Sequence, residues 1–164
     1  MVGTTSGTAV VTTPSDTQIL ITRSFDAPKH LVYRAWTTPS LIKRWWSGGI
    51  GEVTVAEVDL RVGGKWRYVM LAGGGFEVGF HGEFKEIVPD SLIVATEVYE
   101  GAPDPSGEGV LNTHTFTEEA GRTTLTLLTD AGTREVRDMI LESGMEEGMQ
   151  KGWDLLEQIA VSLR

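Results

Sequence analysis

The chain has 164 residues, 40% of them hydrophobic and 23% charged, which is the composition of one ordinary globular domain. It contains no cysteine, so disulfides, thiolate nucleophiles and cysteine-based metal sites are excluded, in keeping with a reducing compartment. The formal net charge is −9 and uneven: residues 1–85 carry 9 basic and 7 acidic side chains, residues 86–164 carry 5 and 16. Proteins bind a phosphate backbone through clustered Lys and Arg, and the net charge of this chain has the opposite sign. Nucleic acid is therefore not an expected partner.

The first 16 residues, MVGTTSGTAVVTTPSD, lack the basic region and the apolar run of a signal peptide. Their Thr, Ser and Gly content predicts a flexible lead-in, with partial order around Ala9-Val10-Val11. No apolar run approaches the roughly 20 residues of a membrane span. We expect a cytoplasmic protein in which residues 17–164 form one domain.

The first predicted elements are a strand and two short helices. The strand, 17–26, alternates in polarity and is rich in β-branched residues. Helices are expected at 27–37 and 39–46, where Pro28 and Pro39 suit first-turn positions and Thr38 suits an N-cap.

The middle of the chain predicts strand after strand. Their links are short, which requires antiparallel neighbours, apart from a Pro- and Gly-rich loop at 101–109 that we expect to be mobile. The six predicted strands cover 52–60, 65–72, 76–88, 91–100, 110–119 and 122–130.

The chain ends in two helical segments, 133–142 and 144–163, with Ser143 and Glu146 matching a capping box between them. The second segment is about 30 Å long, enough to cross a small sheet. Its apolar stripe consists of Met145, Met149, Trp153, Leu156, Ala160 and Leu163. The pattern predicts an α+β fold, with this helix against an antiparallel sheet of six to seven strands.

No catalytic or metal-binding motif is found. A phosphate-binding loop, a GxSxG elbow and an HExxH motif are all missing from the sequence. His30, His81 and His114 do not have the spacing of metal ligands. We predict no metal and no cofactor, and assign no catalytic residue.

Three polar side chains allow two interpretations each. His114 shares a strand face with Asn112 and Phe116, so it is either a core histidine or a ligand-orienting group or base. Glu97 lies in an otherwise apolar strand and faces either water or a desolvating interior. Arg67 leaves the same two alternatives open, whereas His81 is expected on the opposite face from its neighbour Phe80.

Large apolar side chains with polar tips gather on predicted inner faces. Trp66, Tyr68 and Met70 share one face of the strand 65–72, because side chains alternate along a strand. Met149 and Trp153 lie on the stripe of the last helix. Such residues either fill a core, which is their commoner role, or line a ligand pocket.

Several segments together resemble the SRPBCC (START-like) superfamily, in the branch similar to the C-terminal domain of the activator of Hsp90 ATPase. The resemblance runs from about residue 17 to 163. It is carried by FDAP (25–28), the double Trp at 45–46, DLRVGG (59–64) and GMEEGM (144–149).

The resemblance implies a helix-grip fold, in which a curved antiparallel sheet wraps around the C-terminal helix and encloses an apolar cavity. Relatives bind lipids, hormones or polyketides, and some are cyclases or dehydratases. The implied cavity-lining residues are Trp36, Trp46, Trp66, Tyr68, Met70, Phe80, His114, Met149 and Trp153.

Three functions are compatible with the sequence. The leading hypothesis is binding of a small hydrophobic or aromatic molecule in the internal cavity. The second is an enzyme on apolar or polyketide-like substrates that uses His114, Glu97 or Tyr68 as acid or base. The third, a co-chaperone-type partner of an Hsp90-type protein, rests on family analogy. A homodimer through exposed strand or helix surface is also compatible.

Overall fold

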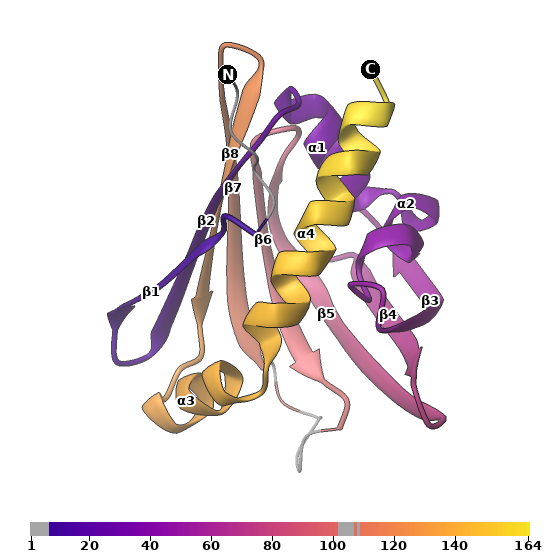
Figure 1. Ribbon diagram of the computed structural model, residues 1–164. Coiled ribbons are helices and arrows are strands. Elements are labelled where there is room, and N and C mark those ends of the chain that lie inside the picture. Colours follow the sequence, from indigo (N-terminus) through magenta and orange to yellow (C-terminus); the bar gives the residue numbers. More distant parts are fainter. Residues whose placement is uncertain (1–6, 102–106, 108) are drawn as a thin grey trace.

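The computed structural model describes residues 7–101, 107 and 109–164. In that part of the chain, eight antiparallel strands form one curved sheet in the order β1-β2-β8-β7-β6-β5-β4-β3 (Figure 1). The strands are β1 (Val10–Ser15), β2 (Gln18–Phe25), β3 (Gly51–Val58), β4 (Lys65–Ala72), β5 (Phe76–Val88), β6 (Leu92–Tyr99), β7 (Val110–Glu119) and β8 (Arg122–Asp130). The antiparallel arrangement and the predicted strands are confirmed.

One strand was not expected. β1 lies inside the predicted flexible lead-in and pairs with β2 at the edge of the sheet. Most of its side chains are exposed, so backbone hydrogen bonds rather than burial hold it in place. The sheet therefore has eight strands instead of six to seven. Most of the predicted mobile loop, residues 102–106 and 108, lies outside the described residues.

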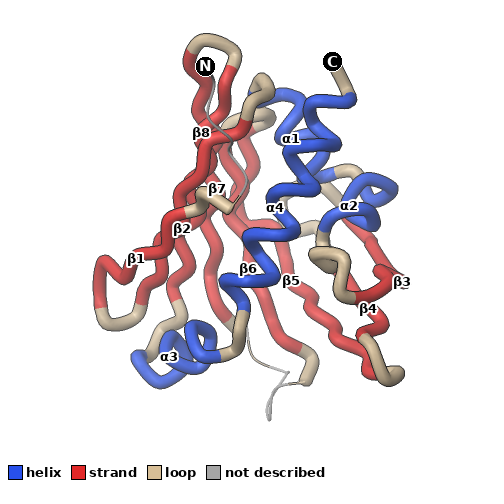
Figure 2. Tube along the Cα trace, viewed as in Figure 1, coloured by secondary structure: helices blue, strands red, loops and turns tan. Residues whose placement is uncertain are grey.

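The helices lie on one side of the sheet (Figure 2). The long C-terminal helix crosses that face, and the two short helices after β2 pack beside it. They are α1 (Lys29–Thr37), α2 (Pro39–Trp45), α3 (Arg134–Glu142) and α4 (Met145–Ser162). The predicted helix-grip architecture is confirmed, and we call the sheet face toward α4 the inner face.

One of the two predicted helix caps is confirmed and the other is wrong. Thr38 is the N-cap of α2, with Pro39 in the first turn, although its side chain makes no capping hydrogen bond. The capping box at α4 is wrong: the Ser143 hydroxyl donates to the Ile140 carbonyl and so closes α3. The N-cap of α4 is Gly144, whose φ of 81° is the left-handed region that glycine tolerates without steric cost.

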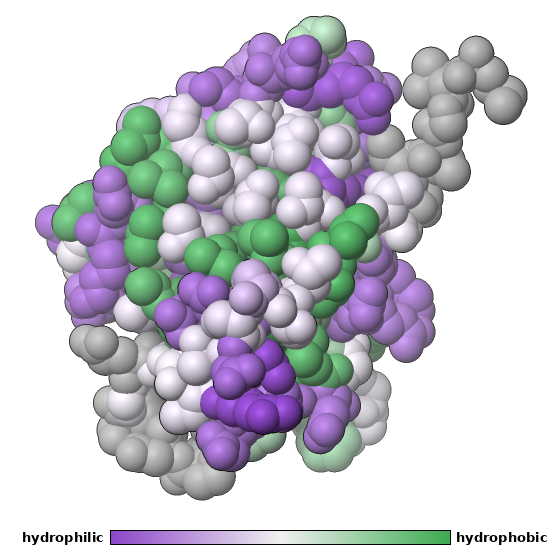
Figure 3. Space-filling model, turned by 90° about the vertical axis from the view of Figure 1, so that its left-hand side faces the viewer, coloured by the Kyte–Doolittle hydropathy of each residue, from purple (hydrophilic) through white to green (hydrophobic). Residues whose placement is uncertain are grey.

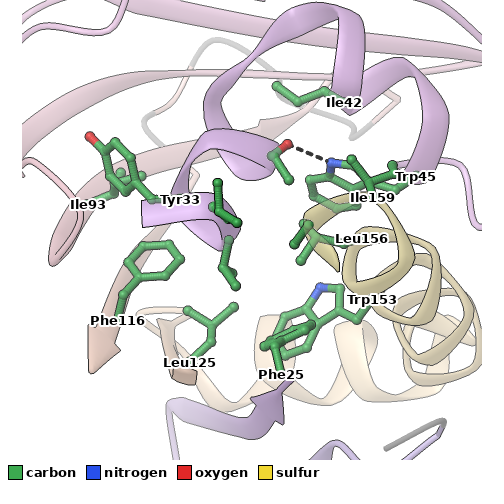
Figure 4. Packing of buried hydrophobic residues seen from close by; sticks show 14 of the residues in the cluster. Phe25, Tyr33, Ile42, Trp45, Ile93, Phe116, Leu125, Trp153, Leu156 and Ile159 are labelled. Atoms are coloured by element: carbon green, nitrogen blue, oxygen red, sulfur yellow. Dashed lines mark hydrogen bonds between the residues drawn. The ribbon is translucent and has the colours of Figure 1, made fainter. Parts of the chain in front are cut away.

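The core fills the space between α1, α4 and the β2–β8–β7 part of the sheet. Figure 4 shows Phe25, Phe116, Leu125 and Leu156 converging there, and each is at most 2% exposed. Trp45 joins α2 to this core and donates its Nε1–H to the Ala35 carbonyl at 2.9 Å. Burial of these side chains drives the packing of helices onto sheet.

Candidate functional site

The structure turns all nine predicted cavity-lining residues toward the space between sheet and helices. For the strand residues this follows from register, because residues opposite each other in antiparallel strands share a face. Tyr68 is opposite Phe80, and Trp66 is opposite Gly82. The nine are Trp36, Trp46, Trp66, Tyr68, Met70, Phe80, His114, Met149 and Trp153.

The first of two ring groups surrounds Trp36 on α1. The Trp36 ring centroid lies 5.0 Å from that of His114 and 5.7 Å from that of Trp153, both edge-on. Trp153 continues toward Phe25 at 6.0 Å, and both are buried. This group belongs to the tightly packed part of the interior.

The second ring group joins α2 to strands β4 and β5. Trp46 packs edge-on against Tyr68 at 5.5 Å and against Phe80 at 5.7 Å. Trp66 lies 4.7 Å from Tyr68 and donates its Nε1–H to the Thr96 carbonyl at 3.1 Å. Gly82 leaves the space for this indole, since a Cβ at that position would collide with Thr96 O and Trp66 Nε1.

Exposure on the inner face rises from one end to the other. Side chains facing the C-terminal half of α4, such as Phe25 and Leu125, are fully buried. Toward the N-terminal half of α4, side chains of the same face remain half-buried. We call this the open end, and its members are Tyr68, Met70, Phe80, Glu97 and Met149. Ligand sites are lined mostly by apolar and aromatic side chains, and the open end has such a lining.

A carboxyl group completes the open end. Glu97 faces inward because β6 pairs it with Val110, whose neighbours Asn112 and His114 point to the same side. Asn112 Nδ2 donates to Glu97 Oε1 at 3.3 Å, and Thr129 Oγ1 donates to Asn112 Oδ1 at 2.7 Å. This arrangement settles the orientation of Glu97, which the sequence left open.

The surroundings of Glu97 disfavour its charge. Burial raises the pKa of the Glu97 carboxyl, and the hydrogen bond from Asn112 offsets only part of that rise. Burial also raises the pKa of the Tyr68 phenol, and the Glu97 carboxylate raises it further. Glu97 as a residue is half-buried.

His114 is the buried imidazole that the sequence left with two interpretations. It is 8% exposed, and burial lowers the pKa of His114 to about 4 against a backbone hydrogen bond involving Ile93 that raises it. Its Nδ1 is buried and has no hydrogen-bond partner in the structure. At neutral pH the imidazole is therefore uncharged.

Arg67 and His81 lie on the outer face, opposite the site. Glu100 accepts two hydrogen bonds from Arg67, each 2.9 Å, and lies 2.9 Å from His81 Nδ1. The prediction that His81 faces away from Phe80 is confirmed. Arg67 therefore does not reach the inner face.

The sequence reasoning missed Arg23, a buried cation on the inner face. Its Nη1 donates to Asp154 of α4 at 2.6 Å and its Nη2 to Glu157 at 3.2 Å. The alternation of side chains along the strand could have predicted that Arg23 faces inward, because it has the same strand parity as Ile19, Ile21 and Phe25. Asn112 and Thr129 were also missed as partners of Glu97, and no local motif marks them.

A separate groove of about 510 Å³ runs between α2 and α4, lined by Arg44, Leu155, Gln158 and Ile159. None of the nine predicted residues lines it. Among residues 7–101, 107 and 109–164, no group of three His, Asp or Glu side chains is placed to hold a metal ion. Within the same residues, no helix has the length and apolarity needed to cross a membrane.

The curved antiparallel sheet gripping a C-terminal helix defines the helix-grip class of the SRPBCC superfamily. The family model described as activator of Hsp90 ATPase homolog 1-like protein matches residues 26–160, and the chain belongs to that family. A search of curated proteins found no match.

Solved structures of bacterial proteins share the fold. A protein from Rhodobacter sphaeroides is 22% identical, with a TM-score of 0.84 over 95% of this chain and 99% of that one. Protein Ms6760 from Mycobacterium smegmatis is 22% identical, with a TM-score of 0.82 over 95% and 99%. A protein from Chromobacterium violaceum is 25% identical, with a TM-score of 0.73 over 87% and 96%.

Proposed function

We propose that the protein binds a small, largely apolar molecule between the inner face of the sheet and the N-terminal half of α4. The observation that carries this proposal is the open end. Its apolar side chains face inward and are only half-buried: Tyr68, Met70, Phe80 and Met149. Contact with these side chains would remove apolar surface of the ligand from water, at about 25 cal/mol per Å² before ordering costs.

Thermal shift and tryptophan fluorescence with a panel of aromatic and aliphatic compounds test the proposal. A ligand that binds only the folded protein at about 100 times its Kd stabilises it by roughly 2.7 kcal/mol, which is a clear rise in Tm. Trp46 and Trp66 lie in the second ring group, so their emission reports on occupancy. No shift with any compound of the panel would overturn the proposal.

A matched pair of methionine variants locates the site. Met149 is half-buried on the inner side of α4, whereas Met139 on α3 is 63% exposed. Met149→Ala is expected to weaken binding roughly fivefold to tenfold through lost apolar contact. Met139→Ala removes the same side chain from the surface and should leave the affinity within about twofold. Equal effects of the two substitutions would place the ligand elsewhere.

Acid–base chemistry on the bound molecule is a second candidate function. It is favoured by Glu97 and Tyr68, which both lie on the inner face of the sheet and whose pKa values are raised by burial. A general acid of this kind needs a substrate group within hydrogen-bond reach. The test compares wild type and Glu97→Gln on apolar or polyketide-like compounds. A product that the wild type forms and the variant does not would support turnover. Identical product profiles of the two proteins would exclude this role for Glu97.

A co-chaperone-type function has the family description as its support. Retention of the protein on immobilised Hsp90 would favour that role, and no retention would count against it. The outward-facing side chains supply polar and apolar groups alike, as Figure 3 shows for the side of the molecule at the left of Figure 1. A homodimer stays a prediction, to be tested by sedimentation.

A further inference from the structure

When it is ionised, the Glu97 carboxyl has no cationic partner among the described residues. Within residues 7–101, 107 and 109–164, no Lys, Arg or His side chain forms an ion pair with its carboxylate. The remaining residues, 1–6, 102–106 and 108, contain none of these three types. The inner-face cation Arg23 is engaged by Asp154 and Glu157. Inward-facing carboxylates are normally paired, because an isolated buried charge is costly.

The hydrogen-bond network leaves one oxygen of Glu97 available. Thr129 donates to Asn112 Oδ1, which turns the Asn112 amide nitrogen toward Glu97 Oε1. Glu97 Oε2 accepts no hydrogen bond from the described residues. The carboxyl group is therefore held in one orientation with an acceptor atom free to meet a donor from outside.

Aromatic rings lie beside Glu97 on the inner face. Tyr68 of β4 is opposite Phe80 of β5, and Phe80 is opposite Tyr99, which has the same strand parity as Glu97 two residues earlier on β6. Tyr68 in turn packs against Trp66 and Trp46, and Phe80 extends the ring group. Ring faces attract cations, and a carboxylate beside such faces is suited to an ammonium group.

We propose that the molecule bound at the open end is an organic cation, a compound with a protonated primary amine on an apolar, aromatic body. The ammonium group donates to Glu97 Oε2 and the apolar body contacts the second ring group. This inference rests on the proposed function and adds the chemical class of the ligand. The ammonium group supplies the positive charge that residues 7–101, 107 and 109–164 do not place beside Glu97.

Isothermal titration with three matched probes tests the charge preference: 2-phenylethylamine, 2-phenylethanol and 3-phenylpropionate at pH 7. The amine is expected to bind about tenfold tighter than the alcohol, and the carboxylate weakest of the three. The alcohol has nearly the same size and apolar area as the amine, so the ratio between the two isolates the contribution of the charge.

Glu97→Gln removes the charge and keeps the shape of the side chain, while one acceptor oxygen is replaced by an NH2 donor. The variant should lose the roughly tenfold amine preference while its affinity for the alcohol stays within about twofold. Glu77→Gln is the matched control, because Glu77 is exposed and lies opposite Leu71, with the outward side chains of β5. It changes the net charge equally and should preserve the preference. An unchanged melting temperature of each variant verifies folding.

The outcomes separate this inference from the proposed function. Equal affinities of wild type for the amine and the alcohol would overturn the inference while supporting the apolar site. The same holds if Glu97→Gln keeps the amine preference. Binding of none of the three probes would overturn both statements for this class of ring compound.

Discussion

Arg23→Met tests what holds α4 to the sheet. The Arg23 side chain is fully buried, and its guanidinium bridges Asp154 and Glu157, which are 23% and 14% exposed. The same guanidinium lies 4.8 Å from the centroid of the Phe25 ring. Methionine fills much of the volume but supplies no positive charge, so two carboxylates one helical turn apart lose their shared cation.

The expected loss of stability is large. Removing one member of a buried ion pair costs about 3–5 kcal/mol, because the remaining charge is left uncompensated in the interior. Partial exposure of the two carboxylates places Arg23→Met near the lower limit, about 3 kcal/mol. For a domain of this size that corresponds to a fall in Tm of roughly 6–12 °C. Urea unfolding followed by tryptophan fluorescence measures it as a lower midpoint at constant m value.

Arg67→Met is the matched control on the outer face. Arg67 also pairs with a carboxylate, Glu100, but its side chain is 46% exposed. An exposed pair contributes less than about 1 kcal/mol, so this variant should unfold close to the wild type. The reasoning is refuted if Arg23→Met loses no more stability than Arg67→Met, or if added salt abolishes the difference between them.

Two other predictions concern pH and packing. His114 is held neutral with a pKa of about 4, below its usual 6.5, so the protein takes up a proton on unfolding between these two pH values. The free energy of unfolding therefore falls by about 3 kcal/mol as the pH drops through that window. His114→Phe should flatten the pH dependence of the urea midpoint, and an unchanged slope would contradict the assignment. Gly82→Ala should lose more than about 2 kcal/mol, because the methyl group collides with Thr96 O and Trp66 Nε1. In Gly148→Ala, on α4, the added methyl group meets open space, so the free energy of unfolding should rise by up to about 1 kcal/mol. Equal losses of stability in Gly82→Ala and Gly148→Ala would argue against a packing effect at Gly82.

Most elements were predictable because their signals are local. Alternation predicted the seven strands from β2 to β8, and the 3.6-residue period predicted the apolar stripe of α4. β1 was missed because its sequence, VVTTPS, has mostly exposed side chains and forms a strand through backbone pairing with β2. The capping box failed because Ser143 has two compatible roles, and closing α3 excludes starting α4.

The candidate site was predictable in its apolar part and less so in its polar part. Parity alone placed Trp66, Tyr68 and Met70 on one face of β4. Parity also divides β6 into two faces, but it does not say which face is inner, so the orientation of Glu97 stayed open. Pairing with β7 decides it, since Val110 opposite Glu97 is buried.

The sequence by itself determined the order of the elements, the amphipathic character of α4 and the class of fold, because hydrophobic periodicity is a property of neighbouring residues. Only the tertiary structure decided which strands are neighbours and which polar groups meet. Glu97 and Asn112 are 15 residues apart, and Arg23 and Asp154 are 131 apart. Such contacts depend on register and on helix placement, and these are set by packing of the whole domain.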